Sequence, residues 1–442
     1  MKLNFHLVKG SLVGALGGLL FGFDTAVIAG TTHGLTLAFH LDPTTLGRTV
    51  SIALWGTVIG AIFSGAPGQK YGGRNTLRFL AVCYVVSAVG CSLAWSWHAL
   101  MAFRFIGGLG IGGSSVLGPV YIAEIAPAKW RGRLVGTFQI NIVIGILLAY
   151  LSNYSIARWI GGPEDWRWMF GVASVPAFLF LILLFTIPQS PRWLATQNRG
   201  EEAHGVLTLI GAADPEVELA EIQASIHLER SQKQERLFSR KYVFPLFLAI
   251  TIGAFNQFSG INAILYYLSD IFARAGFSQI SGDLQSVAVG AMNLVATLAA
   301  MTVIDKIGRK ALLLIGSVGM AISLGGVAAV FFTNSHQKDL LWCLLAFIGF
   351  FAISQGAVIW VYIGEVFPNR VRAKGQSVGS SSHWIMNAII SQEFPVIAKT
   401  SGAYPFVFFS AMMVVQFFVV LFFFPETKGV SLEALQHHLG LD

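Results

Sequence analysis

The chain has 442 residues, of which 55% are hydrophobic and only 12% are charged, and its formal net charge is +7. Soluble domains carry charge on roughly a quarter of their residues, so this composition excludes an ordinary soluble protein. The apolar residues form long runs without the polar–apolar alternation of barrel strands, which favours membrane-spanning helices.

Twelve runs are long and apolar enough to cross a bilayer, since about 20 residues span the hydrocarbon core as a helix. In chain order they are Leu12–Gly30, Val50–Ala66, Leu77–Trp95, Met101–Ile122, Leu134–Tyr154, Trp168–Ile187, Val243–Tyr267, Gln285–Ile304, Ala311–Thr333, Leu340–Gly364, Gln376–Ala398 and Tyr404–Phe424. The first run contains Asp24 and lacks a small-residue cleavage site, so we expect a permanent helix rather than a leader peptide.

The basic residues divide unequally between the two sides of this map. Most lie on the side that holds both termini and the loop between the sixth and seventh runs. The other side holds only Arg48, Arg158, Arg167, Arg274, Lys338 and Lys399. By the positive-inside rule, both termini are expected in the cytoplasm, in a multi-pass protein of the cell inner (plasma) membrane. Topology accounts for the basic excess, so no nucleic-acid partner is expected.

A polar loop at Gln189–Lys241 divides the chain into two sets of six runs. The sequence therefore predicts an N-terminal six-helix bundle at 1–188 and a cytoplasmic linker with short amphipathic helices at 189–241. A C-terminal six-helix bundle at 242–425 and a short cytoplasmic tail at 426–442 follow.

The two halves repeat one another. Glu124 and Arg131 recur 241 positions later, as Glu365 and Arg372. The turn 70–74 recurs at 306–310, and the string 188–192 is echoed at 425–428. Parallel repeats of this kind predict a substrate site between the halves near the middle of the membrane, opened alternately to each side.

Six strings then carry a family resemblance. They are Gly17–Asp24 (GGLLFGFD), Arg104–Gly112 (RFIGGLGIG), Glu124–Gly132 (EIAPAKWRG), Pro188–Arg192 (PQSPR), Gln257–Asn262 (QFSGIN) and Pro425–Gly429 (PETKG). Along essentially its whole length the chain resembles the sugar porter family of the major facilitator superfamily, which includes proton-coupled bacterial symporters and facilitative glucose transporters. The resemblance implies an all-α membrane protein with twelve transmembrane helices in two pseudo-symmetric six-helix bundles.

A sugar presents many hydroxyl groups and two faintly apolar ring faces, so its site needs neutral amides, which both donate and accept, and an aromatic floor. The candidate substrate-binding residues are Phe21, Gln139, Asn256, Gln257, Asn262, Asn293, Gly356, Trp360, His383, Trp384 and Asn387. The resemblance places Gln139, Gln257, Asn262, Asn293 and Trp360 in contact with the sugar. The alternative is that these amides only join helices to one another.

Gln257 and Asn262 are five residues apart, about 140° around a helix, so they share a face only if the helix is broken between them. Gly260 marks the expected break. Two positions depart from the resemblance: Asn256 stands where many relatives have Gln, and His383 where Asn or Gln is usual.

Asp24 and Arg104 are ionisable residues within expected spans, where an unpaired charge is costly and the default is a functional pair. An Asp next to Arg stays ionised, and it takes up a proton when the Arg moves away. Proton-coupled members of the resembled family carry Asp here, so this pair is the candidate proton-coupling site. The alternative is a static ion pair.

The repeated Glu–Arg pairs and nearby charges predict a latch at the cytoplasmic ends of the helices. The candidate gating residues are Tyr266, Tyr267, Arg74, Glu124, Arg131, Arg192, Asp305, Arg309, Glu365 and Arg372. The alternative is that the basic residues only set topology. Gln69, Gly73 and Gln189 replace residues that are charged in the resembled family, which predicts a weakened latch.

The sequence thus predicts import of a hexose or pentose with a proton by alternating access, with the monosaccharide, the proton and the lipid bilayer as partners. A passive facilitator is the nearest alternative, and a membrane sugar sensor a more distant one. No enzyme activity, cofactor or metal site is expected, and we expect the chain to act as a monomer.

Overall fold

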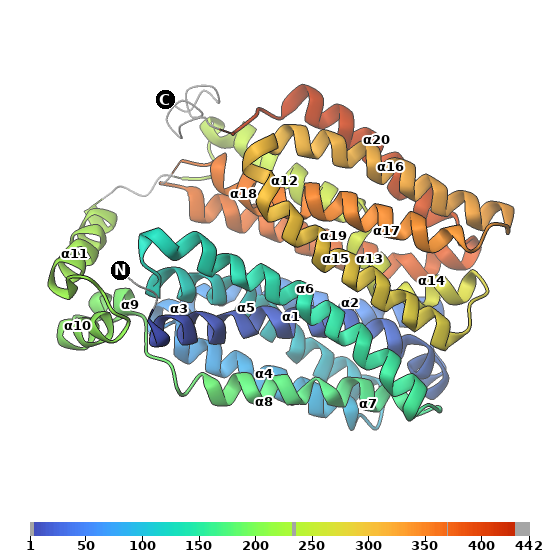
Figure 1. Cartoon of the computed structure of the whole chain (residues 1–442), viewed down its shortest axis with the longest axis horizontal. Helices are drawn as coiled ribbons and strands as arrows, with labels where there is room; N and C mark the ends of the chain where they lie inside the picture. Colours follow the sequence, from blue (N-terminus) through green and yellow to red (C-terminus); the bar gives the residue numbers. More distant parts are fainter. Residues whose placement is uncertain (1–3, 232–235, 369, 429–442) are drawn as a thin grey trace. The chain divides into compact units, whose positions relative to one another are not determined.

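The computed structural model describes residues 4–231, 236–368 and 370–428, and the regular elements of these residues are all helices (Figure 1). The predicted domain boundaries at 1–188, 189–241 and 242–425 and the tail at 426–442 are not tested by the structure and stay predictions. The part of that tail at 429–442 lies outside the described residues.

The helices of the first half and of the linker are as follows: α1 (Phe5–Phe39), α2 (Pro43–Phe63), α3 (Gly65–Tyr71), α4 (Gly73–Ser92), α5 (Trp97–Ile125), α6 (Ala128–Trp159), α7 (Asp165–Val172), α8 (Ser174–Leu183), α9 (Pro191–Thr196), α10 (Gly200–Leu209) and α11 (Pro215–Ser231). The second half contains the short η1 (Arg240–Tyr242), α12 (Val243–Phe258), α13 (Ile261–Tyr266), α14 (Leu268–Arg274), α15 (Gln279–Ile307), α16 (Arg309–Thr333), α17 (Asp339–Phe351), the π-helix η2 (Ala352–Gly356), α18 (Ala357–Glu365), α19 (Arg372–Thr400) and α20 (Tyr404–Phe423).

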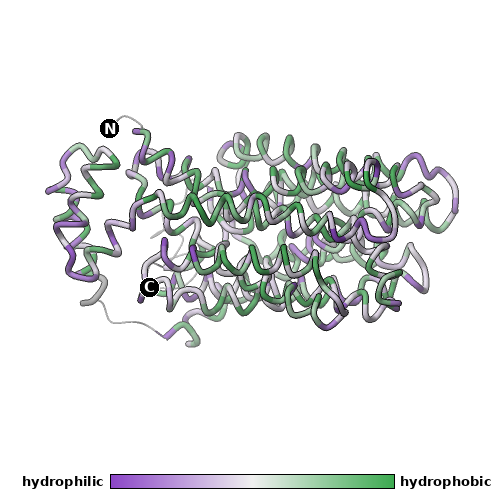
Figure 2. The backbone as a smooth tube through the Cα atoms, turned by 90° about the horizontal axis from the view of Figure 1, so that it is seen from below, coloured by the Kyte–Doolittle hydropathy of each residue, from purple (hydrophilic) through white to green (hydrophobic). Residues whose placement is uncertain are grey.

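Within the described residues, 11 helical stretches are long and apolar enough to cross a membrane. The helix α19, with 29 residues, covers the remaining expected run and is rich in serine and amide side chains. Figure 2 shows hydrophobic residues along the long helices and hydrophilic residues at their ends and in the group of short helices that carries α10 and α11. The prediction of an all-α membrane protein is confirmed.

By their contacts, the residues form two compact units. Unit 1 comprises Met1–Thr25, Trp55–Ala149 and Arg167–Lys233. Unit 2 comprises Ala26–Leu54, Tyr150–Trp166 and Gln234–Asp442. The helices α1, α2 and α6 therefore each contribute one segment to either unit.

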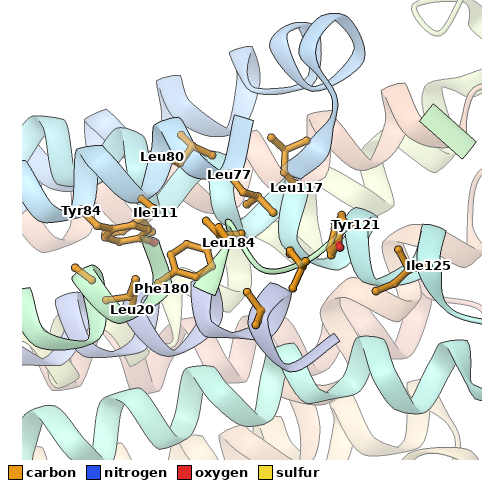
Figure 3. Close-up of a cluster of buried hydrophobic side chains, with 14 of the residues drawn as sticks. Leu20, Leu77, Leu80, Tyr84, Ile111, Leu117, Tyr121, Ile125, Phe180 and Leu184 are labelled. Carbon is orange, nitrogen blue, oxygen red and sulfur yellow. The ribbon is translucent and has the colours of Figure 1, made fainter. Parts of the chain in front are cut away.

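The core of unit 1 is a cluster of buried apolar side chains from α1, α4, α5 and α8. Figure 3 shows Leu20 of α1, Leu77 of α4, Ile111 of α5 and Phe180 of α8 directed toward one another. The helices α4 and α5 run along one another through this core.

Glycines allow the backbones of unit 1 to approach closely. A Cβ at Gly112 of α5 would collide with the backbone of Thr57 in α2, and a Cβ at Gly22 of α1 would collide with the carbonyl of Ile142 in α6. The glycine-rich string at 104–112 therefore serves close helix packing.

In unit 2, α12 contacts α19, and α16 contacts both α17 and α20. The segments of α2 and α6 that belong to this unit are hydrogen-bonded to it. The Tyr150 hydroxyl of α6 donates to the carbonyl of Leu265 at 2.8 Å, and the Ser51 hydroxyl of α2 donates to the amide oxygen of Gln392 at 3.3 Å. These bonds tie first-half segments to α13 and α19.

The short helices α9, α10 and α11 lie together beside α3 at one end of unit 1 (Figure 1). Ser190 caps α9, because its hydroxyl accepts the N–H of Trp193 at 3.1 Å. Asp214 accepts the N–H of Val217 at 3.1 Å at the start of α11. Capping groups of this kind let short helices persist where few tertiary contacts support them.

Candidate functional site

The break between α12 and α13 organises the candidate sugar site. Gly260 adopts a left-handed conformation, with φ of 80°, and the α-helix ends before it and restarts at Ile261. The Asn262 side chain can therefore donate to the Gln257 amide oxygen, at 3.1 Å. The predicted break, and the shared face that it gives to Gln257 and Asn262, are confirmed.

Gln257 is the centre of a buried polar network. Its amide nitrogen donates to Asn256 at 3.0 Å and lies 3.2 and 3.3 Å from the two ring nitrogens of His383 on α19. The side chains of Asn256, Gln257 and His383 are all at least nine-tenths buried. Because buried amides are stable only when hydrogen-bonded, this network holds each polar head in a fixed orientation.

Aromatic rings border the network. The Trp360 ring on α18 lies 5.2 Å from the His383 ring, and the Trp384 ring lies 4.9 Å from it. Trp384 is buried, whereas Trp360 is 41% exposed. The structure thus brings together the amides and the aromatic floor that a sugar site requires.

Asn387, one helical turn beyond His383 on α19, is hydrogen-bonded to the candidate gating residue Tyr266. Its amide donates to the Tyr266 hydroxyl at 3.1 Å, and its oxygen accepts the Ser391 hydroxyl at 3.1 Å. The Tyr267 hydroxyl donates to the carbonyl of Ser391 at 2.9 Å, and its ring stacks on Phe394 at 5.1 Å. Both tyrosines are buried, and their gating role stays a prediction.

The other candidates lie elsewhere. Asn293 is buried on α15, which contacts η2, and Gly356 is the last residue of η2. Phe21 and Gln139 are half-buried on α1 and α6 and belong to unit 1. Their role in sugar binding stays a prediction, as does that of Asn293 and Gly356.

Sequence reasoning missed Gln355, which lies in η2 beside Gly356. Its amide nitrogen donates to Gln416 of α20 and lies 3.5 Å from the carbonyl of Phe255, while its amide oxygen is buried without a hydrogen-bond partner among the described residues. π-Helical turns inside α-helices often mark functional positions. The feature of the sequence that could have identified Gln355 is its polar amide side chain within the apolar run 340–364.

Asp270 of α14 was also missed. It lies between two spans, Arg240–Tyr266 and Gln279–Ile304. Burial raises the pKa of Asp270 to about 6, although the Thr32 hydroxyl, Arg274 and His33 act in the opposite direction. A carboxyl of this kind titrates close to the physiological range.

The candidate proton-coupling residues form the expected pair within unit 1. Arg104 Nη1 of α5 lies 3.5 Å from Asp24 Oδ2 of α1, and only 3% of the Arg104 side chain and 17% of the Asp24 side chain are exposed. The Arg104 guanidinium also lies over the Phe170 ring, at 5.6 Å. Such a buried pair is stable only while each partner neutralises the other.

Among the gating candidates of unit 1, Glu124 interacts with the Ser190 hydroxyl and with the charge of Arg192. Arg131 Nε donates to the carbonyl of Ala123 at 3.1 Å. Arg74 donates to the carbonyl of Ile187 at 3.1 Å. These side chains gather where α5 and α6 meet the start of the linker.

The gating candidates of unit 2 centre on Glu365. It forms an ion pair with Arg309 Nη2 at 3.0 Å and accepts the Thr427 hydroxyl at 2.6 Å. Arg372 Nε donates to the carbonyl of Phe367 at 3.2 Å. The Asp305 side chain lies outside the part of the chain that the structure describes.

Glu426 completes this group. Its carboxylate accepts the N–H groups of Arg309 at 2.9 Å and Lys310 at 3.0 Å, at the first turn of α16. Burial acts to raise the pKa of Glu426, but these N–H groups and those of Thr427 and Lys428 hold it below its usual range. A carboxylate is favoured at this position because a helix N-terminus carries partial positive charge.

The family model described as "Sugar (and other) transporter" matches residues 10–439. The glucose transport protein of Synechocystis sp. is 37% identical, over 96% of this chain and 95% of the relative. The D-xylose-proton symporter of Escherichia coli is 36% identical, over 96% of this chain and 94% of the relative. The inward open structure of the E. coli xylose transporter XylE superposes with a TM-score of 0.87 at 35% identity, over 97% and 98% of the two chains.

These matches confirm the predicted major facilitator fold, with twelve transmembrane helices in two pseudo-symmetric bundles. The relatives are transporters, in agreement with the prediction that the chain is not an enzyme. It is a multi-pass membrane protein, and it belongs to the sugar porter family of the major facilitator superfamily.

Proposed function

We propose that the chain imports a monosaccharide, a hexose or a pentose, together with a proton by alternating access. The polar network around Gln257 supports the sugar, and the Asp24–Arg104 pair is the observation that carries the coupling. Relatives named a D-xylose-proton symporter and an arabinose-proton symporter, 36% and 35% identical to this chain, support the same assignment.

Sugar recognition rests on amides that are already oriented. Asn262, Gln257 and Asn256 form one hydrogen-bonded row, so a sugar hydroxyl meets donors and acceptors in fixed positions. Pre-orientation reduces the entropy lost on binding. Trp360, which is the exposed member of the aromatic set, offers its face to the sugar ring. Gln139 and Phe21 complete the site from the first half, and Asn293, Gly356 and Asn387 from the second.

Proton coupling follows from the ion pair. While Arg104 lies next to Asp24, the carboxylate is stabilised in its charged form. When the helices shift and the distance between Arg104 and Asp24 grows, the desolvated carboxylate of Asp24 takes up a proton. A conformational change between the outward-open and inward-open forms that requires both the sugar and the proton to be bound would couple their fluxes.

Gating uses both ends of the helices. The bonds from Tyr150 to Leu265 and from Ser51 to Gln392 lie at the end predicted to face outward, and they hold that end closed. At the end predicted to face the cytoplasm, the repeated Glu–Arg pairs act as a latch that is made in the outward-open form. Both termini then face the cytoplasm of a cell whose plasma membrane holds the protein, and a monomer suffices for transport.

Uptake into proteoliposomes tests the proposal. Labelled hexoses and pentoses are supplied with and without an imposed pH gradient, and liposomes without protein are the blank. Accumulation above the external concentration that requires the gradient supports symport. Saturable uptake that only equilibrates the sugar and ignores pH would assign a passive facilitator. Binding of sugar without any flux would instead favour a sensor.

A further inference from the structure

A cavity of about 410 Å³ lies at the end of unit 1 that carries α9 and α10. Its walls include Arg74 of α4, Gln189 and Trp193 at the start of the linker, and Arg199, Glu202 and Leu209 of the α10 region. Cavities of about 300–1,000 Å³ hold small organic ligands. The transport mechanism proposed above makes no use of this space.

The charge of the cavity wall is positive. Arg74 and Arg199 contribute two cations, and the single carboxylate, Glu202, is already held by Arg199 through two bonds of 2.6 Å. Burial disfavours the charge of Arg74, and the neighbouring cations Arg78 and Arg199 act in the same direction, whereas Tyr121 opposes them. Within the described residues, Arg74 has no ion pair with a carboxylate, and its Nε is buried without a hydrogen-bond partner.

The equivalent turn in the second half of the chain, before α16, is closed by a carboxylate. There the turn at Gly308, with φ of 105°, is closed by the carboxylate of Glu426, which accepts two backbone N–H groups of α16. The equivalent turn of the first half, at Gly72 with φ of 85°, is closed by the neutral Gln189. Its amide oxygen accepts the backbone N–H of Arg74 at 3.2 Å.

The first half therefore keeps one basic residue, Arg74 in place of Lys310, and the positive helix start. It has Gly73 in place of Arg309 and the neutral Gln189 in place of the carboxylate of Glu426. Guanidinium groups bind phosphate through short, charge-assisted hydrogen bonds. The remaining wall, formed by Trp193, Leu194 and Leu209, is largely apolar and leaves room beyond a single phosphate group.

We infer that this cavity binds a small phosphate monoester, with the phosphate on Arg74 and the organic group against Trp193. The site is separate from the sugar site around Gln257, and its occupation is measured without any transport assay. The phosphate supplies the negative charge that Gln189 does not.

Binding is measured on the full chain in detergent, by calorimetry with inorganic phosphate and with glucose 6-phosphate as probes. Gln189→Glu places a carboxylate of the same shape beside Arg74 and should weaken binding by about tenfold or more. Arg74→Gln should do the same. Arg133→Gln, on an exposed residue of α6, lowers the net charge by the same amount and should leave the affinity unchanged.

If neither probe binds, or if all three variants weaken binding equally, the inference is wrong. If Arg74→Gln does not fold, Gln189→Glu alone decides, because it keeps Arg74 and changes only the charge of one lining side chain. A second arm adds phosphatidic acid in nanodiscs. Competition with glucose 6-phosphate assigns the site to a lipid headgroup, and absence of competition assigns it to a soluble ester. Both results support a phosphate monoester site.

Discussion

Asn262 donates a 3.1 Å hydrogen bond to Gln257 across a break in the helix that carries them both. A continuous helix would turn the two amides about 140° apart. The bond orients the Gln257 amide nitrogen toward Asn256 and His383, so the row of polar groups depends on the geometry of a single turn.

Replacing Gln257 with Ala should therefore raise the apparent KM for sugar by about tenfold or more, because the ligand and the neighbouring amides both lose hydrogen-bond partners. Initial uptake rates at equal protein expression measure the effect. Gln337→Ala, on an exposed residue before α17, is the control. An unchanged KM for the Gln257 variant would remove this residue from the site.

Gly260→Ala should lower both thermal stability and sugar affinity. A left-handed backbone costs a residue with a Cβ about 1–2 kcal/mol, and here the Cβ would also meet the Phe409 ring. Gly132 has open space around it and serves as the control for a Gly-to-Ala change. Unfolding temperature and sugar binding are measured on purified protein. Equal behaviour of the two variants would contradict a special role for this turn.

Asp24→Asn should abolish accumulation of sugar under a pH gradient while sugar counterflow persists, because the site is then fixed in its neutral form. Arg104 loses its anion, so a lower unfolding temperature is also expected. Glu393→Gln, at an exposed acid of α19, is the matched control. A variant at Asp24 that still concentrates sugar would place the proton site elsewhere.

Glu365→Gln should shift the resting population toward the inward-open form, since it removes a negative charge from the latch that we propose for the outward-open form. Accessibility of single cysteines from each side of the membrane reports the shift. Glu201→Gln, at an exposed linker residue, should leave accessibility unchanged. The same pattern in both variants would leave the repeated Glu–Arg pairs without a gating role.

Asp270 gives a pH dependence of stability. Its folded pKa of about 6 lies above the ordinary Asp value of 3.8, so the folded state binds more protons between these values. Stability should therefore rise as the pH falls through this window, and Asp270→Asn should be more stable than the parent at pH 8 but not at pH 4. Unfolding temperatures of both proteins across this range check the sign. A difference that is independent of pH would contradict the raised pKa.

Much of this architecture could be predicted because its causes are local in the sequence. The lengths of the apolar runs predicted the membrane spans. The 3.6-residue period of an α-helix, together with Gly260, predicted the helix break between Gln257 and Asn262. The position of Gln355 could not be predicted, because its hydrogen-bond partners, Gln416 and Phe255, belong to helices that are distant in the sequence. The division of α1 between two units near Thr25 also depends on tertiary contacts, and no feature of the sequence at this point predicts it.

The close crossing of α1 and α6 at Gly22 and Ile142 has a mechanical consequence. Because the backbone of Gly22 is in direct contact with the backbone of Ile142, neither helix can slide or tilt at this point without displacing the other. The crossing lies two residues from Asp24 and three from Gln139. Under the proposed coupling, a small displacement of α1 on protonation of Asp24 would be transmitted directly to the α6 segment that carries Gln139, with no compressible side chain between them. In that proposal, the rigidity of the contact between Gly22 and Ile142 would determine how strongly protonation of Asp24 changes the position of Gln139.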